Sequence, residues 1–313
     1  MSSVAHVPGG GGAPAGPASP APAARGRRGA YTPYLLLLPG LAWLALFFVV
    51  PMIYLFSQSL QEGSIEEGYQ LTWHWQTYVD ALSTYERQFL RSFFYAGTAT
   101  LLALLIGYPL AYTIAFKAGR WKNLLLVLVI APFFTSFLIR TLAWKTILSS
   151  EGVVVQVFQS TGLLDVLRWL HLISSDQLLS TPFAVVMGLT YNFLPFMTLP
   201  LYASLERIDI RMLEAGADLY ATPFTAFRKV TFPLSMPGVV AGTLLTFIPA
   251  AGDFINSRLL GNPSTTMIGQ VIDSQFLRVL DYPTAAALSF TLMVSIVVLV
   301  AIYIRRAGTE ELV

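Results

Sequence analysis

The sequence predicts an all-α membrane protein with six transmembrane helices, a cytoplasmic loop of coupling-helix type, and both termini in the cytoplasm. Hydrophobic residues make up 55% of the 313-residue chain, charged residues make up 12%, and the mean hydropathy is +0.63. These values exclude an ordinary soluble domain. Six apolar runs, each near the roughly 20 residues that a helix needs to cross a bilayer, alternate with polar segments.

The first 29 residues differ in composition from the rest of the chain. Residues 1–29 are mostly Gly, Pro, Ala and Ser and end in Arg25, Arg27 and Arg28. They contain no apolar run, so we expect a disordered cytoplasmic tail ahead of a permease-like membrane domain at 30–313. The tail is not a signal peptide by itself, because no apolar h-region lies within it.

The expected spans follow the apolar runs in order. They cover about residues 34–56, 89–116, 124–148, 181–203, 238–256 and 283–304. Between the first two, residues 59–88 are polar but contain Trp73, Trp75 and Tyr78, which is typical of a short amphipathic element at the membrane interface. Pro195, Pro200 and Pro249 lie inside later runs, where we expect broken helices.

The distribution of positive charge predicts the orientation. Twelve of the nineteen Lys and Arg residues fall on one side of the six-span arrangement: Arg25, Arg27, Arg28, Lys117, Arg120, Lys122, Arg207, Arg211, Arg228, Lys229, Arg305 and Arg306. The other seven fall on or near the opposite side. Because cytoplasmic loops carry the excess of Lys and Arg, both termini and the loop at 206–236 are expected in the cytoplasm.

The loop at 206–236 has a clear local pattern. Asp209 is a suitable cap for a helix beginning at Ile210, and that helix should end near Tyr220. Thr222 is a good N-cap for a second helix, with Pro223 at its first position. The second helix should run from Phe224 to about Thr231 and stop at Pro233 and Pro237. The pattern alone fits an ordinary interfacial amphipathic hairpin equally well.

The same segment resembles a known motif. Glu-Ala-Gly at 214–216, then Ala221, Pro223, Phe227, Pro233 and Pro237-Gly238 look like the cytoplasmic "EAA" loop of the permease subunits of bacterial ABC importers. The resemblance implies coupling helices that sit in a cleft of an ATPase subunit. The residues it assigns to this coupling are Glu214, Ala215, Gly216, Asp218, Tyr220, Ala221, Phe224, Phe227 and Arg228.

One position departs from the family pattern. Tyr220 stands where the family usually has Gly, and a Tyr with a left-handed backbone costs roughly 1–2 kcal/mol. The geometry of this turn is therefore open.

Further stretches resemble the spermidine/putrescine permeases of the same importer class. They are SFLIRTLAWKTIL at 136–148, YNFLPFMTLPLYASLERID at 191–209, and several segments within 247–283. The resemblance implies an importer core at about 89–304 that moves polyamines inward by alternating access in the bacterial inner membrane. It also implies three kinds of partner: ABC ATPase subunits, a second homologous permease, and an extracytoplasmic substrate-binding protein.

The chain shows no chemistry of its own for ATP hydrolysis or another reaction. None of its four lysines follows a Gly, so it has no phosphate-cradling G-x-x-x-x-G-K-[ST] loop. It has no Cys, and its three histidines are widely separated, so no metal cluster is indicated. We expect a non-catalytic subunit that binds no cofactor, with ATP and Mg held by the partner ATPase.

Few ionisable residues lie near the spans, and these are the candidates for a transport pathway. Asp253 is expected near the outer end of the fifth span, where it either contacts a cationic substrate or is an interfacial acid that faces outside water or pairs with Arg258. Tyr191, Asn192 and Phe196 surround Pro195 and either line the pathway or only pack.

Two cations lie toward the outer end of the third span. Arg140 and Lys145 are expected to snorkel or pair with carboxylates rather than bind substrate.

Other functions remain open on sequence grounds. The same importer fold serves other small solutes, and substrate choice is imposed largely by the binding protein. A self-contained secondary carrier or channel would need polar residues deep in several spans, and it would leave the EAA-like loop unexplained.

Overall fold

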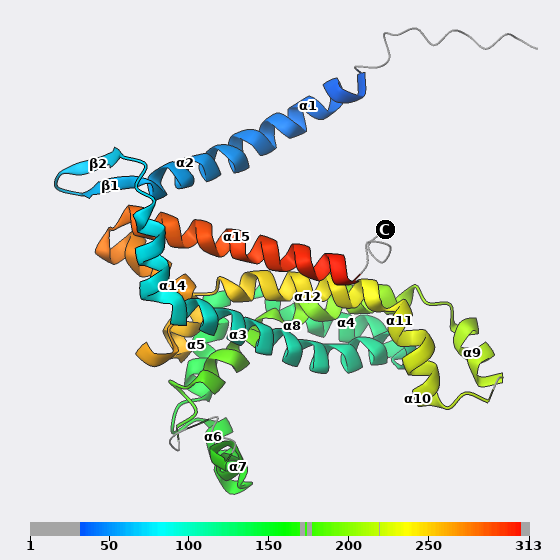
Figure 1. Cartoon of the computed structure of the whole chain (residues 1–313). Coiled ribbons are helices and arrows are strands. Elements are labelled where there is room, and N and C mark those ends of the chain that lie inside the picture. Colours follow the sequence, from blue (N-terminus) through cyan, green and yellow to red (C-terminus); the bar gives the residue numbers. More distant parts are fainter. Residues whose placement is uncertain (1–31, 170–172, 174–176, 219, 308–313) are drawn as a thin grey trace, which may run out of the picture. The chain divides into compact units, whose positions relative to one another are not determined.

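A computed structural model describes residues 32–169, 173, 177–218 and 220–307 (Figure 1). The predicted disordered tail at 1–29 lies outside the described residues. The chain divides into two compact units at Met52/Ile53, and each is described by itself.

The first unit holds most of the first span. Helix α1 (Thr32–Leu44) continues through the π-helical turn η2 (Ala45–Val49) into α2 (Val50–Ser59). The wider π turn lies just before Pro51, which has no N–H to donate to the helix. The apolar stretch Leu36–Ser59 is 24 residues long, so the first predicted span is confirmed.

The second unit holds the other five spans. Three are long helices: α3 (Gln76–Tyr112, extended by the π turn η3 at Thr113–Lys117), α8 (Pro182–Glu206) and α15 (Tyr282–Ala307). Two are bent pairs of shorter helices, so the described residues contain four long apolar helices, or six spans when each bent pair counts once. The prediction of an all-helical, six-span fold is confirmed.

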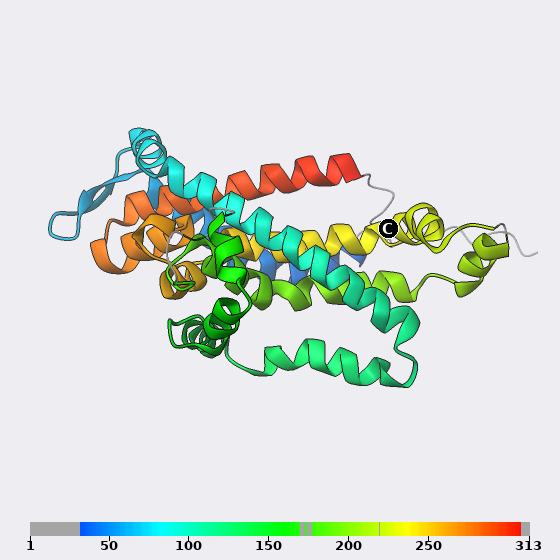
Figure 2. The ribbon, with the colours of Figure 1, turned by 90° about the horizontal axis from the view of Figure 1, so that it is seen from below.

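The first bent pair corresponds to the predicted third span. The turn η4 (Gly119–Trp121) leads into α4 (Lys122–Ile130), η5 (Ala131–Phe134) and then α5 (Phe137–Ile147). The two halves meet at an angle of 96°. Helix α4 lies along one edge of this unit in Figure 2. The sequence predicted one span here, and the extended backbone of Thr135 and Ser136 divides it into two helices.

The second bent pair begins in the cytoplasmic loop. Helix α10 (Pro223–Ala226), the π turn η6 (Phe227–Thr231) and α11 (Phe232–Leu234) run together and meet α12 (Met236–Ala251) at 63°. Contrary to prediction, Pro233 does not stop the helix, which continues to Leu234; the π turn η6 comes shortly before this proline, as η2 does before Pro51.

The expected breaks inside α8 and α12 were wrong. Helix α8 runs unbroken through Pro195 and Pro200, and α12 runs through Pro249. Packing against neighbouring helices keeps α8 helical through both prolines, because 67% of an 18-residue apolar stretch of α8 is buried within the protein. Helix α12 ends at Ala251, earlier than the predicted residue 256, and the short helix α13 (Ile255–Leu260) follows.

The polar segment before the second span also differs from prediction. Strands β1 (Gln61–Ser64) and β2 (Gly68–Leu71) pair antiparallel, with Gln61 opposite Leu71. Helix α3 begins at Gln76, but the backbone of Tyr85 is not helical (φ = −115°, ψ = 16°), so a kink separates a short first part, which carries Tyr78, from the longer part that follows. The longer part begins near the predicted residue 89, and the Tyr78 hydroxyl lies 2.6 Å from Ser59 Oγ.

Short elements gather at both ends of α12 (Figure 1). Helices α9 (Ile210–Asp218), α10 and α11 lie at its cytoplasmic end. Helix α13 and five further short elements lie toward the opposite end. These five are α6 (Val153–Ser160), α7 (Leu163–Trp169), η7 (Pro263–Thr265), α14 (Ile268–Ser274) and η8 (Gln275–Val279).

The core of the second unit forms where α8 and α12 approach closely. A Cβ at Gly238 would lie 2.6 Å from Ser204 Cβ and 2.8 Å from the carbonyl oxygen of Pro200. A Cβ at Gly242 would lie 3.0 Å from the carbonyl oxygen of Met197. Small residues that let membrane helices touch are a common source of their packing energy. These contacts fix the position of α12, which carries the cytoplasmic loop at one end.

We predict that Gly238→Ala lowers the stability of the purified chain by about 1–3 kcal/mol, because the new methyl group meets backbone atoms that cannot move aside. Gly97→Ala in α3 is the matched control, since nothing lies within 4 Å of its Cβ position. That control should gain up to about 1 kcal/mol from higher helix propensity. Thermal melting in mild detergent measures both, and equal shifts would contradict the close approach of α8 and α12.

Candidate coupling loop and transport pathway

The first helix of the cytoplasmic loop begins as predicted. Asp209 Oδ1 accepts a hydrogen bond from the backbone N of Arg211 at 3.0 Å, which satisfies a free donor of α9. Glu214 and Asp218 are exposed and form no ion pair within the described part of the chain. Their carboxylates are thus available to another protein. The surroundings of Ala215 and Gly216 lie outside what the structure describes.

The turn after α9 has a strained backbone. Tyr220 has φ = 57°, in the left-handed region, and its side chain is 97% exposed. A Tyr in this conformation costs roughly 1–2 kcal/mol, and such strain is concentrated at functional sites. Thr222 caps the next helix, because its Oγ1 accepts a hydrogen bond from Thr225 N at 3.3 Å. The predicted turn is confirmed, and Tyr220 adopts the conformation that Gly would adopt more easily.

The two phenylalanines of the loop face different surroundings. Phe224 is 71% exposed. Phe227 instead packs edge-on against Tyr108 of α3, with ring centres 5.6 Å apart, and it also contacts Tyr112 and Phe232. The sequence placed both rings in a partner cleft, but the structure leaves only Phe224 free to reach one.

The ring of Tyr108 extends this contact to the bend before α12. The Tyr108 hydroxyl lies 2.7 Å from Ser235 Oγ, and Ser235 is the residue between α11 and α12. The loop is therefore tied through Phe227 and Tyr108 to both α3 and α12. Of the remaining predicted coupling residues, Ala221 is half-buried and Arg228 is exposed.

A buried polar network joins two of the predicted pathway residues, Asn192 and Asp253. Asn192 Nδ2 donates to Asn256 Oδ1 at 3.1 Å and to Thr141 Oγ1 at 3.2 Å. Asn256 in turn donates to Asp253, from its backbone N at 2.8 Å and from Nδ2 at 3.2 Å. The network connects α5, α8 and α13, and all four side chains are buried. Sequence reasoning missed Thr141 and Asn256.

Asp253 is buried and does not face water. It is 8% exposed, and Arg258 pairs with Asp273 Oδ2 at 3.1 Å instead. Asp253 lies beyond the end of the α12 span, and burial raises the pKa of its carboxyl from 3.8 to about 6, although hydrogen bonds from Asn256 oppose the shift. The alternative of a solvated acid paired with Arg258 is wrong.

The other two predicted pathway residues belong to an aromatic cluster on α8. Tyr191 packs edge-on against Trp144 of α5, with ring centres 5.4 Å apart. Phe196 packs edge-on against Phe133 at 5.0 Å and contacts Phe193. The cluster and the polar network thus share the same boundary between α8 and the bent pair α4–α5.

The family described as "Binding-protein-dependent transport system inner membrane component" matches residues 103–307, which is more than half of the chain. The chain belongs to this family of inner-membrane permeases.

Similar proteins support the same assignment. The spermidine/putrescine transport system permease protein PotB of Haemophilus influenzae is 35% identical over 267 residues, covering 84% of this chain and 90% of that protein. PotB of Escherichia coli is 36% identical over 267 residues, covering 85% of this chain and 94% of that protein. A crystal structure of a bacterial ABC transporter that imports the acidic polysaccharide alginate has a TM-score of 0.60 at 21% identity, covering 91% of this chain and 96% of that chain. This last likeness concerns the fold alone.

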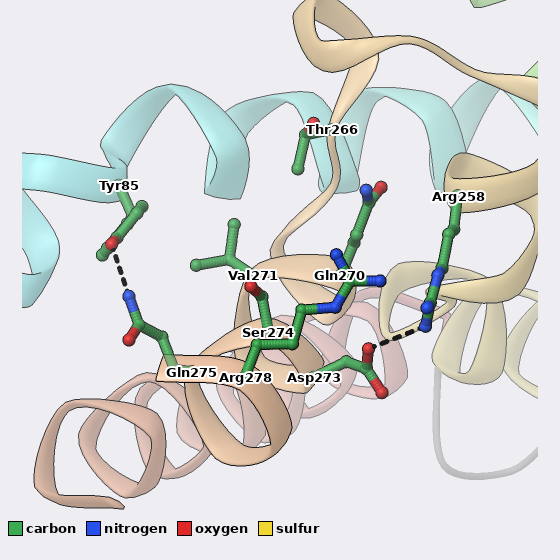
Figure 3. Close-up of a pocket in the computed structure, with 9 residues that line it drawn as sticks. All are labelled: Tyr85, Arg258, Thr266, Gln270, Val271, Asp273, Ser274, Gln275 and Arg278. Atoms are coloured by element: carbon green, nitrogen blue, oxygen red, sulfur yellow. Dashed lines mark hydrogen bonds and ion pairs between the residues drawn. The ribbon is translucent and has the colours of Figure 1, made fainter. Parts of the chain in front are cut away.

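The permease has a polar cavity at the outer end of its second unit, of about 300 Å³ (Figure 3). Gln275 Nε2 donates to the Tyr85 hydroxyl at 2.7 Å on one side, and the Arg258–Asp273 pair lies on the other. The Arg278 side chain extends into the space between them (Figure 3). Two guanidinium groups face one carboxylate, so the cavity repels cations and is unsuited to a polycationic solute.

Arg140 of the permease is not placed as the sequence predicted. It is 9% exposed, and its Nε and Nη1 atoms are buried without a hydrogen-bond acceptor. Its Cζ lies 6.0 Å from the ring centre of Phe133 and 5.6 Å from that of Phe137. It neither snorkels to water nor pairs with a carboxylate of the described residues, whereas Lys145 is exposed.

Proposed function

We propose that this permease moves polyamines such as spermidine and putrescine into the cell as one of two permease subunits of an ABC importer. The remaining subunits are ABC ATPases in the cytoplasm and a substrate-binding protein outside. The observation that carries the coupling role is the loop of α9 to α11, which exposes Glu214, Asp218, Tyr220 and Phe224 while Phe227 is packed on α3. The similarity to PotB over most of the chain supports the substrate class.

The contacts of the loop suggest how ATPase movement reaches the membrane. The exposed acids and rings of α9 and α10 bind the ATPase subunit, which holds ATP and Mg. When the ATPases close, the loop moves, and Phe227 and Tyr108 carry the displacement to α3 and α12 because aromatic packing transmits force without a flexible joint. The spans then rock as bodies between outward-open and inward-open arrangements.

The buried network supplies groups that suit an ammonium ion. Such an ion needs acceptors in place of water. Asp253 offers a carboxylate, and Asn192 Oδ1 is a buried acceptor with no partner in the described part of the chain. The aromatic cluster beside them offers ring faces for cation–π contacts. We therefore assign Asp253 and Asn192 to cation contact and Tyr191 and Phe196 to the wall beside them.

The decisive experiment purifies the tagged permease from native membranes in mild detergent and identifies the proteins that accompany it. ATP hydrolysis is then measured with empty and with spermidine-loaded binding protein. We expect an ATPase, a second permease, and hydrolysis that spermidine stimulates. Co-purification without a spermidine response would retain the importer and reject the substrate. Transport by the purified chain alone would favour a self-contained carrier.

We predict that Glu214→Lys lowers uptake at least about tenfold, a change of about 1.4 kcal/mol, while ATP hydrolysis continues. The reversed charge disturbs the contact with the ATPase but leaves the fold intact, because Glu214 is exposed and forms no ion pair with the residues that the structure describes. Glu67→Lys on the exposed outer hairpin is the control for net charge. Unchanged uptake in Glu214→Lys would rule out its coupling role.

We predict that uptake by the wild-type importer falls as pH drops through about 6, because protonation removes the charge of Asp253. Asp253→Asn should show low uptake with no such step. The free energy of unfolding changes in the opposite direction to uptake. Burial favours the neutral carboxyl of Asp253, so its contribution to stability is complete below pH 3.8 and is lost as the pH rises through about 6. The measurement is uptake into proteoliposomes between pH 5 and 8. Identical pH profiles for the two proteins would exclude Asp253 from the pathway.

A further inference from the structure

The guanidinium group of Arg140 is incompletely satisfied within its own chain. A guanidinium carries five N–H donors, and its Nε and Nη1 are buried with no acceptor. Most polar groups of the neighbouring network are engaged, although Asn192 Oδ1 has no partner among the described residues. Thr141 Oγ1 accepts from Asn192, and Asn256 binds Asp253, the carboxylate that is buried among the described residues.

The aromatic rings around Arg140 do not offset this deficit. The contacts with Phe133 and Phe137 attract the guanidinium group but offer no hydrogen-bond acceptor. The cost of removing an ion from water is offset only by a counter-charge with good geometry. Arg140 therefore needs an anion that the described part of the permease chain does not supply.

The protein surface beside Arg140 is apolar and uncovered. Phe134 is 85% exposed, Ile139 is 63% exposed and Leu138 is 48% exposed. On the neighbouring helix α4, Val127 and Leu128 are 59% and 58% exposed. Lipid tails can cover such a surface, but they contain no hydrogen-bond acceptor. A span of another membrane protein that packs on this surface can cover it and also bring a carboxylate to Arg140.

We infer that Arg140 binds a carboxylate side chain from a membrane span of the second permease subunit. A carboxylate supplies the two acceptor oxygens that match a guanidinium fork. The uncovered residues of α4 and α5 would then pack against the span that carries this acid. The inference rests on the proposed function, because it requires that a second permease be present.

The test compares Arg140→Leu in the isolated permease and in the assembled transporter. In the isolated chain the substitution removes an unpaired buried charge, so the melting temperature should rise. In the assembly it leaves the partner's carboxylate unpaired, so the complex should melt at a lower temperature and retain at least tenfold less of the second permease. Lys145→Leu, on the exposed side of α5, is the control and should shift neither preparation.

Each other result overturns the inference. A rise in melting temperature in both preparations means that Arg140 has no partner in the assembly, and a fall in both means that it stabilises its own chain. Normal assembly with lost uptake means that Arg140 contacts a travelling solute. Arg140→Gln, which removes the charge but stays polar, replaces Arg140→Leu if the latter does not fold. If the wild-type permease purifies without a second permease, the proposed assembly fails, and the inference fails with it.

Discussion

A bilayer offers no hydrogen-bonding solvent, so every polar side chain within this fold must find its partner in protein. The network of Thr141, Asn192, Asn256 and Asp253 pairs most of its polar atoms where three elements converge, and it leaves Asn192 Oδ1 without a partner among the described residues. It joins α5, just after the sharp bend, to α8 and to the short helix that follows α12. It adds to the hydrogen bond from Ser180 N to the Leu260 carbonyl, which also joins the start of α8 to α13.

The network and the cytoplasmic loop lie at opposite ends of α12, so this helix connects them. At the cytoplasmic end, Phe227 and Tyr108 fasten the loop to α3, and Ser235 fastens Tyr108 to the bend before α12. Close contact between α8 and α12 at Gly238 prevents the two helices from sliding independently. A displacement of the loop therefore reaches the buried acid at the far end as movement of whole helices.

The sequence predicted the features that depend on local pattern. Span positions followed from apolar length, and the loop turn followed from a Thr–Pro pair at 222–223 that caps and starts a helix. The bend of 96° within the third span was not predictable, because apolar composition is the same in a straight and in a bent helix. The burial of Arg140 without an acceptor was also not predictable, because it depends on how the bent helices pack.

The inward position of Phe227 shows the same limit. Phe224 and Phe227 are three residues apart and share a face in any helical pattern. Only one edge of the loop touches α3, however, so one ring is covered and the other is exposed. Likewise, Asn256 carries no signal in sequence, because its importance arises from Asn192, which is distant along the chain.

The central claim is that the loop and α3 move as one body. The most direct measurement places spin labels at Arg228 in the loop and at Thr113, exposed at the end of α3, within the assembled transporter. Pulsed electron resonance then measures their separation with and without ATP, while labels on the loops of the two permeases confirm that the cycle has advanced. The account predicts one narrow distance distribution that is the same in both states. A distribution that shifts or broadens on ATP binding would contradict it.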